Sequence, residues 1–153
     1  NIGKVDDLIL NQAIDNFEFK SYEASLDVKD FDTSFVKGLS FEDGCATLTK
    51  FTAYLIADGL RKINKQNGVN PHHHIFCGGG RRNKSLMQSI ENYLANKNMI
   101  INDIDDYNFD GNFIESQAFA YLAIRSYLKL PISFPNTTRC KKAISGGDVL
   151  QNF

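Results

Sequence analysis

The stretch HHIFCGGGRRN at residues 73–83 decides the fold class of this chain of 153 residues. A short, partly β-branched run ends abruptly in three glycines, which predicts a strand over residues 73–77 and then a tight turn. A helical pattern follows over residues 84–95, and Met99-Ile100-Ile101 predicts a second strand. The order strand, glycine turn, helix, strand indicates an α/β fold with a short, mostly parallel sheet packed with helices.

Helical periodicity precedes this central part of the chain. Apolar residues at spacings of three and four predict amphipathic helices over residues 5–17 and 40–65. The second helix opens with Ser40-Phe41-Glu42-Asp43, which has the form of a capping box. Residues 18–31 hold no clear period, and residues 32–39 predict a short helix that ends at a glycine.

The pattern changes after the second strand. Residues 103–112 predict an acidic loop, and residues 113–130 predict a helix that is apolar on nearly every side, which implies burial on most of its faces. Residues 132–153 predict no regular element. Two strands are too few for a closed sheet, so we expect the domain to be incomplete, with strands missing upstream.

The composition, 42% apolar and 23% charged, is that of an ordinary globular domain. The net charge of -1 offers no electrostatic basis for binding nucleic acid or an anionic membrane. No apolar run reaches the roughly 18 residues of a spanning helix, and no secretory leader is visible. The three widely spaced cysteines argue against a disulfide framework and favour a reducing, cytoplasmic setting.

The sharpest candidate site is the glycine loop, by which we mean residues 78–80. Glycines let a backbone approach a ligand closely and leave N–H groups free at a helix N-terminus, where an anion is favoured. The spacing matches neither G-x-G-x-x-G nor a phosphate-binding P-loop. A tight turn without a ligand is an equal alternative, and Asn83 is either a polar ligand contact or the cap of the next helix.

The remaining residues are weaker candidates for a functional site. His72, His73 and His74 cannot all converge on one ion, because adjacent strand residues point to opposite faces, so we predict no metal site. Cys77 lies beside a predicted helix N-terminus, which leaves a thiol-dependent enzyme as one alternative. Glu115 opens the apolar helix, where its carboxylate either satisfies the helix dipole or faces a ligand. A solvated loop explains the acidic run of Asp103, Asp105, Asp106 and Asp110.

Four segments resemble one known family. They are Gly3-Lys4-Val5, LSFEDGCATLTKFTAYLIADGL at residues 39–60, IFCGGGRRNKSLM at residues 75–87 and ESQAFAYLAIR at residues 115–125. The third and fourth are similar to the family patterns CGGGxxNxxLM and E-A-x-AFAxLAxR, in the same order. The chain thus resembles the C-terminal part of the anhydro-N-acetylmuramic acid kinases, which belong to the actin-like ATPase and sugar kinase group.

The resemblance implies an actin-like ATPase (ribonuclease H-like) domain that binds ATP, with Mg²⁺, and the sugar between two domains. It implies a cytoplasmic enzyme that opens the ring of 1,6-anhydro-N-acetylmuramic acid and phosphorylates O6 in peptidoglycan recycling. Residues 1–153 would be its C-terminal domain, with the N-terminal domain absent. The nucleotide would contact Gly78, Gly79, Gly80 and Asn83, and the sugar would contact Glu115.

Several departures from the family pattern qualify this implication. The phosphate motif GTSxDG and the DTGPGN segment, whose Asp is expected to be the base, have no counterpart, so no catalytic residue is assigned here and the chain alone is expected to be inactive. A non-catalytic binding domain of the same fold is the alternative. Residues 20–27 differ from the family's PPKSTGRE. Arg139 replaces a glycine, which predicts strain at a positive φ. The sequence allows a homodimer.

Overall fold

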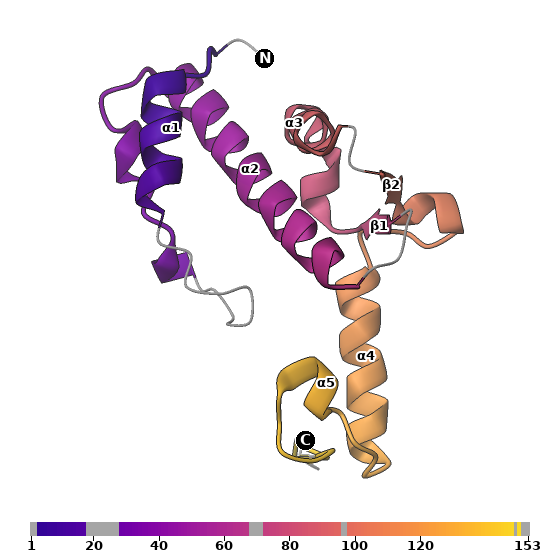
Figure 1. Ribbon diagram of the computed structural model, residues 1–153. Helices are drawn as coiled ribbons and strands as arrows, with labels where there is room; N and C mark the ends of the chain where they lie inside the picture. The colour runs from indigo at the N-terminus through magenta and orange to yellow at the C-terminus, as the bar shows by residue number, and fades with distance from the viewer. Residues whose placement is uncertain (1–2, 18–27, 68–71, 96–97, 149, 151–153) are drawn as a thin grey trace. The chain divides into compact units, whose positions relative to one another are not determined.

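A computed structural model describes residues 3–17, 28–67, 72–95, 98–148 and 150. The chain divides into two compact units, Asn1–Asp103 and Ile104–Phe153. The α/β class predicted from the sequence is confirmed (Figure 1).

The first unit is organised around one long helix, α2 (Phe41–Asn67), against which α1 (Asp7–Asn16) and α3 (Lys84–Leu94) pack. Helix α1 begins at Asp6, whose side chain accepts a hydrogen bond from the backbone N–H of Ile9 (3.0 Å). The predicted capping serine is confirmed, because the backbone N–H of Asp43 donates to Ser40 Oγ (3.1 Å). The Asp43 carboxylate accepts from the backbone N–H of Lys4 (2.7 Å), so it fastens the segment before α1 to the first turn of α2.

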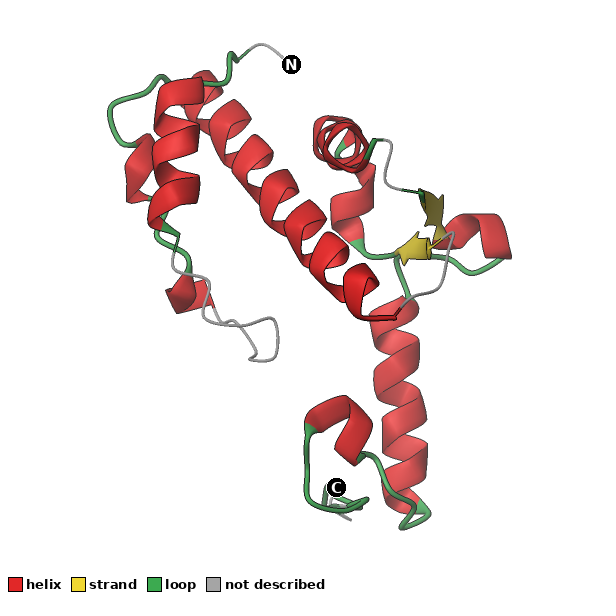
Figure 2. Cartoon of the chain, viewed as in Figure 1, coloured by secondary structure: helices red, strands yellow, loops and turns green. Residues whose placement is uncertain are grey.

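The sheet consists of β1 (His72–Phe76) and β2 (Met99–Asp103), which pair in parallel from His72↔Met99 to Phe76↔Asp103 (Figure 2). One face packs against α2 and α3 around a buried cluster of Ala53, Ala57, Ile90 and Leu94. On the other face Ile75 and Ile100 are 49% and 40% exposed. Parallel sheets are almost always covered on both faces, so this open face is consistent with the expected incomplete domain.

The helices predicted over residues 5–17, 40–65 and 84–95 are confirmed, with ends shifted by a few residues. The short helix predicted over residues 32–39 is wrong. That segment forms only the 3-10 turn Ser34–Val36, and Gly38 follows with φ +100°. Of the segment predicted to be irregular, Val28–Asp30 is a 3-10 turn and residues 18–27 lie outside the described residues.

The second unit contains α4 (Ile114–Tyr127) and the one-turn helix α5 (Pro135–Thr138). The prediction of no element after residue 132 is therefore wrong: Pro135 supplies the fixed φ that opens α5, and Ser133 forms an antiparallel bridge with Ile144. Arg139 follows α5 at φ +58°, so the predicted positive φ is confirmed. No helix in the described part of the chain is long and apolar enough to cross a membrane.

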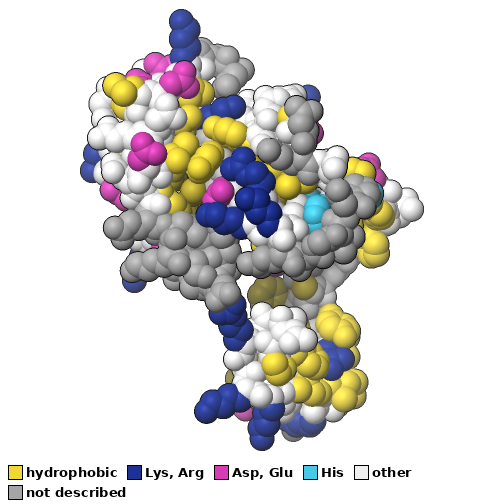
Figure 3. All heavy atoms as spheres, in the orientation of Figure 1, with side chains coloured by type: hydrophobic (Ala, Val, Ile, Leu, Met, Phe, Trp, Pro, Cys, Tyr) yellow, Lys and Arg dark blue, Asp and Glu magenta, His cyan; other side chains and the backbone are white. Residues whose placement is uncertain are grey.

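The predicted burial of α4 is wrong within this chain. The helix contains no buried residue, and Phe119, Ile124 and Tyr127 are each at least 60% exposed. Figure 3 shows apolar side chains gathered on the surface of the second unit. The apolar composition of a helix indicates that it needs a surface to pack against. A unit as small as the second one contains too few residues to provide that surface.

Candidate functional site

The glycine loop leaves the end of β1 and does not open α3 directly. After Cys77 and Gly78 the chain forms one turn of 3-10 helix, Gly79–Arg82, and α3 begins only after Asn83. The N–H groups of the loop are therefore not at the N-terminus of α3. The expectation that they open this helix is wrong.

Only the first of the three glycines is required by the backbone. Gly78 has φ +81° and ψ 174°, a region that is essentially restricted to glycine. Gly79 has no positive φ, and an added Cβ there would meet no atom of the described residues within 4 Å. At Gly80 an added Cβ would make an ordinary contact with Leu86 Cδ2 at 3.9 Å. The fold thus leaves open space above Gly79 and room for a Cβ at Gly80.

The backbone of the loop also offers hydrogen-bond donors. Among the described residues, the N–H groups of Gly78, Gly79 and Gly80 have no backbone acceptor outside the 3-10 turn. Successive free N–H groups on a tight turn form a concave donor surface for phosphate or hydroxyl oxygens. The loop therefore offers backbone donors to a ligand that carries oxygen atoms.

Arg81 is hydrogen-bonded to the glycine loop and is not among the residues predicted from the sequence. Its guanidinium is buried, with the side chain 2% exposed, and Nε donates to Asp103 Oδ1 at 2.9 Å. Nη1 donates to the carbonyl oxygen of Gly78 at 3.0 Å. The structure brings them together because Arg81 follows β1 and Asp103 ends β2, and the carboxyl ends of these parallel strands meet at one edge.

Asn83 caps α3, which was one of its two predicted roles. Its Oδ1 accepts a hydrogen bond from the backbone N–H of Leu86 at 3.1 Å. The side-chain amide nitrogen of this exposed residue has no hydrogen-bond partner among the described residues, so it is the part of Asn83 that suits a ligand contact.

Glu115 lies in the first turn of α4, as predicted, and its side chain is exposed. It belongs to the second unit, whereas the glycine loop belongs to the first. A carboxylate in the first turn is stabilised by the helix dipole, and exposure leaves its oxygens accessible.

The histidines alternate across β1 as predicted. His72 and His74 stack on one face with ring centroids 6.4 Å apart, and Nε2 of His74 lies 2.9 Å from the Asn64 side-chain nitrogen. Burial lowers the pKa of His74, and the neighbouring His72 and His73 lower it further. The described residues hold no group of three metal-ligating side chains.

The remaining candidates have local structural roles. Asp105 Oδ1 accepts from the backbone N–H of Gly111 at 2.7 Å, and Asp110 Oδ1 accepts from that of Asn112 at 2.9 Å. Asp105 and Asp110 thus shape turns of their own segment, whereas Asp103 ends β2 and pairs with Arg81. Cys77 is an exposed free thiol.

Known proteins identify the family. Residues 16–152 match the model of the anhydro-N-acetylmuramic acid kinase family. The chain belongs to this family. It is 54% identical over 155 aligned residues to a protein of Pelagibacter ubique named anhydro-N-acetylmuramic acid kinase, covering 100% of this chain and 41% of that protein.

Two more distant relatives of that family give the same result. A protein of the same name from Caulobacter vibrioides is 38% identical over 97% of this chain and 38% of its own length. Anhydro-N-acetylmuramic acid kinase 2 of Jannaschia sp. is 36% identical over 96% of the chain and 37% of its own length. The chain spans about two fifths of the relatives that it matches.

Proposed function

We propose that this chain is the C-terminal domain of an ATP-dependent kinase that opens and 6-phosphorylates 1,6-anhydro-N-acetylmuramic acid in cytoplasmic peptidoglycan recycling. The relatives named for that kinase support the reaction class. Because the chain spans about two fifths of their length, the remaining catalytic groups would come from other parts of the polypeptide.

One observation carries the nucleotide assignment. Gly79 has no backbone requirement for glycine and no described atom within 4 Å of an added Cβ, although it lies beside free N–H donors. The fold does not require glycine at this position. A ligand that approaches the backbone closely would require it, and this supports the assignment. In this proposal Gly78, Gly79 and Gly80 lie against ATP, and the Asn83 amide nitrogen adds a polar contact.

The sugar and the metal complete the proposal. Glu115 would accept a hydrogen bond from a sugar hydroxyl, as an exposed carboxylate on a helix's first turn can. Phosphoryl transfer needs positioning and charge neutralisation, and Mg²⁺ would supply part of the second while bound to the ATP phosphates.

The test compares this chain with the product of its complete reading frame. Each is incubated with ATP, Mg²⁺ and 1,6-anhydro-N-acetylmuramic acid, and N-acetylmuramic acid 6-phosphate is measured by mass spectrometry. We expect product from the complete protein and none from this chain. No ATP-dependent product from the complete protein would refute the kinase assignment, and turnover by this chain alone would refute its assignment as one domain of two.

A further inference from the structure

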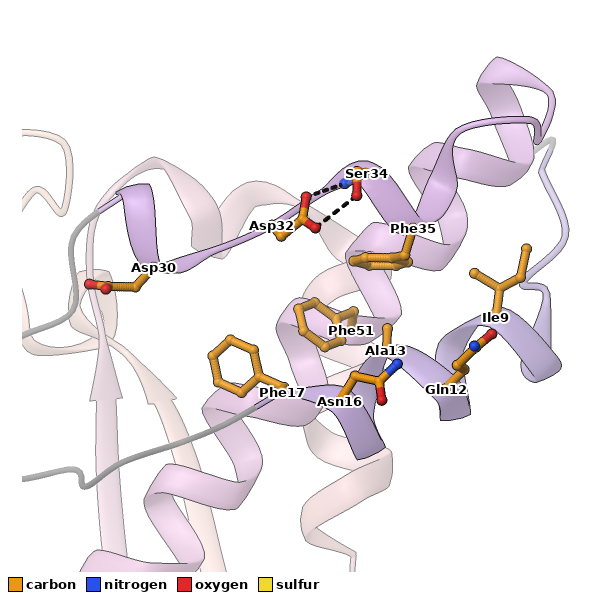
Figure 4. Close-up of a pocket in the computed structure, with 10 residues that line it drawn as sticks. All are labelled: Ile9, Gln12, Ala13, Asn16, Phe17, Asp30, Asp32, Ser34, Phe35 and Phe51. Carbon is orange, nitrogen blue, oxygen red and sulfur yellow. Dashed lines mark hydrogen bonds between the residues drawn. The ribbon is translucent and has the colours of Figure 1, made fainter.

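A separate cavity of about 460 Å³ lies in the first unit (Figure 4). Helix α1 forms one side, residues 30–35 form the other, and Phe51 of α2 lies at the base. Its volume falls within the roughly 300–1,000 Å³ of small-molecule sites. None of its lining residues belongs to the glycine loop.

The α1 side of the cavity presents two amides. Gln12 and Asn16 are four residues apart and therefore lie on one face of the helix. Both side chains are exposed, and neither has a hydrogen-bond partner among the described residues. Each amide supplies both a donor and an acceptor to the cavity.

The opposite side presents a fixed carboxylate. Asp32 accepts hydrogen bonds from the backbone N–H of Ser34 at 2.8 Å and from its hydroxyl at 2.7 Å. These two bonds, the backbone one first, lower the pKa of Asp32, so the group is ionised at neutral pH. Each carboxylate oxygen accepts more than one hydrogen bond, so acceptor capacity remains for a ligand.

The base of the cavity is aromatic. Phe51 is 6% exposed and meets the rings of Phe35 and Phe17 edge to face, with centroids 5.1 and 5.6 Å apart. Polar groups on two sides and an apolar base suit a ring that has C–H faces and a rim of hydroxyls. Of the described residues that line the cavity, Asp32 carries a negative charge and none is Lys or Arg, which opposes a phosphate or carboxylate ligand.

We infer that this cavity binds an uncharged saccharide, whose ring lies against the half-buried ring of Phe35 and whose hydroxyls meet Asp32 and the Gln12 and Asn16 amides. The inference does not rest on the proposed kinase activity, because it uses none of the residues assigned to ATP or to Glu115. Failure of either proposal leaves the other standing.

The test is an NMR titration of the ¹⁵N-labelled protein with N-acetylglucosamine, followed at the backbone signals of Ala13 and Ser34. We expect saturable shifts with a dissociation constant in the millimolar range. The double variant Gln12→Ala/Asn16→Ala loses two neutral hydrogen bonds and should bind about tenfold more weakly. Asn11→Ala, an exposed change on the same helix outside the cavity, is the matched control and should bind as the parent does.

Three results would overturn the inference. One is the absence of saturable shifts at Ala13 and Ser34. Another is unchanged affinity in the double variant, whose exposed substitutions leave the packed side of α1 intact. The third is binding of choline, but not of the saccharide, at the same signals, because the cavity would then be a site for cations on aromatic rings and carboxylates.

Discussion

The two partners of the Arg81–Asp103 ion pair are unequally buried, so we expect the removal of each partner to have a different effect on stability. Arg81 has a side chain that is 2% exposed, whereas that of Asp103 is 41% exposed. Asp103→Ala takes the Asp103 carboxylate away from a buried guanidinium, which costs about 3 kcal/mol of unfolding free energy. Arg81→Met keeps the apolar stem and leaves a carboxylate that water can solvate. We expect it to cost about 2 kcal/mol, the scale of its two hydrogen bonds to Asp103 and to the carbonyl oxygen of Gly78.

Hydrogen exchange measures this difference in the first unit alone. The backbone N–H of Ile90, a fully buried residue of α3, exchanges through large-scale opening of that unit. The matched control is Asp58→Ala, which removes the ion pairs to Lys62 (2.7 Å) and Arg61 (3.5 Å) along α2 and should cost at most about 1 kcal/mol. If Arg81→Met lowers the opening free energy of the first unit as much as Asp103→Ala does, the unequal burial of the two groups does not determine how much each contributes to stability.

Three further predictions follow from the sites. Gly79→Val in the complete protein should raise the KM for ATP with little change in Tm, because its Cβ meets no described atom; Gly78→Val, at φ +81°, should instead lower Tm. Glu115→Gln should lower kcat/KM at least about tenfold with little change in Tm, whereas a helix-only role would lower Tm and spare kcat/KM. His74 has a lowered pKa, so the unfolded chain binds its proton first. Stability should therefore fall as pH drops through about 6.5 and level off below the folded pKa, and His74→Gln should remove this dependence, as denaturation across pH would show.

The sequence predicted the local elements well because their causes are local. Alternating His72, His73 and His74 occupy opposite faces of β1, and Asn83 caps α3, as short-range rules require. The short helix at residues 32–39 failed because Asp32 bonds Ser34 and competes with helical hydrogen bonding.

Long-range contacts explain what the sequence could not predict. The partnership of Arg81 with Asp103 depends on the register that sets Phe76 opposite Asp103, and no local pattern contains that register. The cavity beside Phe51 likewise combines α1, α2 and residues 30–35. Its amides and carboxylates are ordinary surface residues when each is considered along the chain alone.

The energetics of the glycine loop separate structural from functional requirements. Replacing glycine by alanine where the backbone tolerates it stabilises a protein by about 0.4–1 kcal/mol, because the unfolded chain loses freedom. Gly78 cannot be replaced in this way, since its φ and ψ are restricted to glycine. Gly79 and Gly80 are compatible with a Cβ, so retaining glycine there lowers stability without a benefit to packing. Local choices that oppose stability are expected at functional sites. The second and third glycines are therefore the stronger indicators of a ligand, although the first has the more unusual backbone.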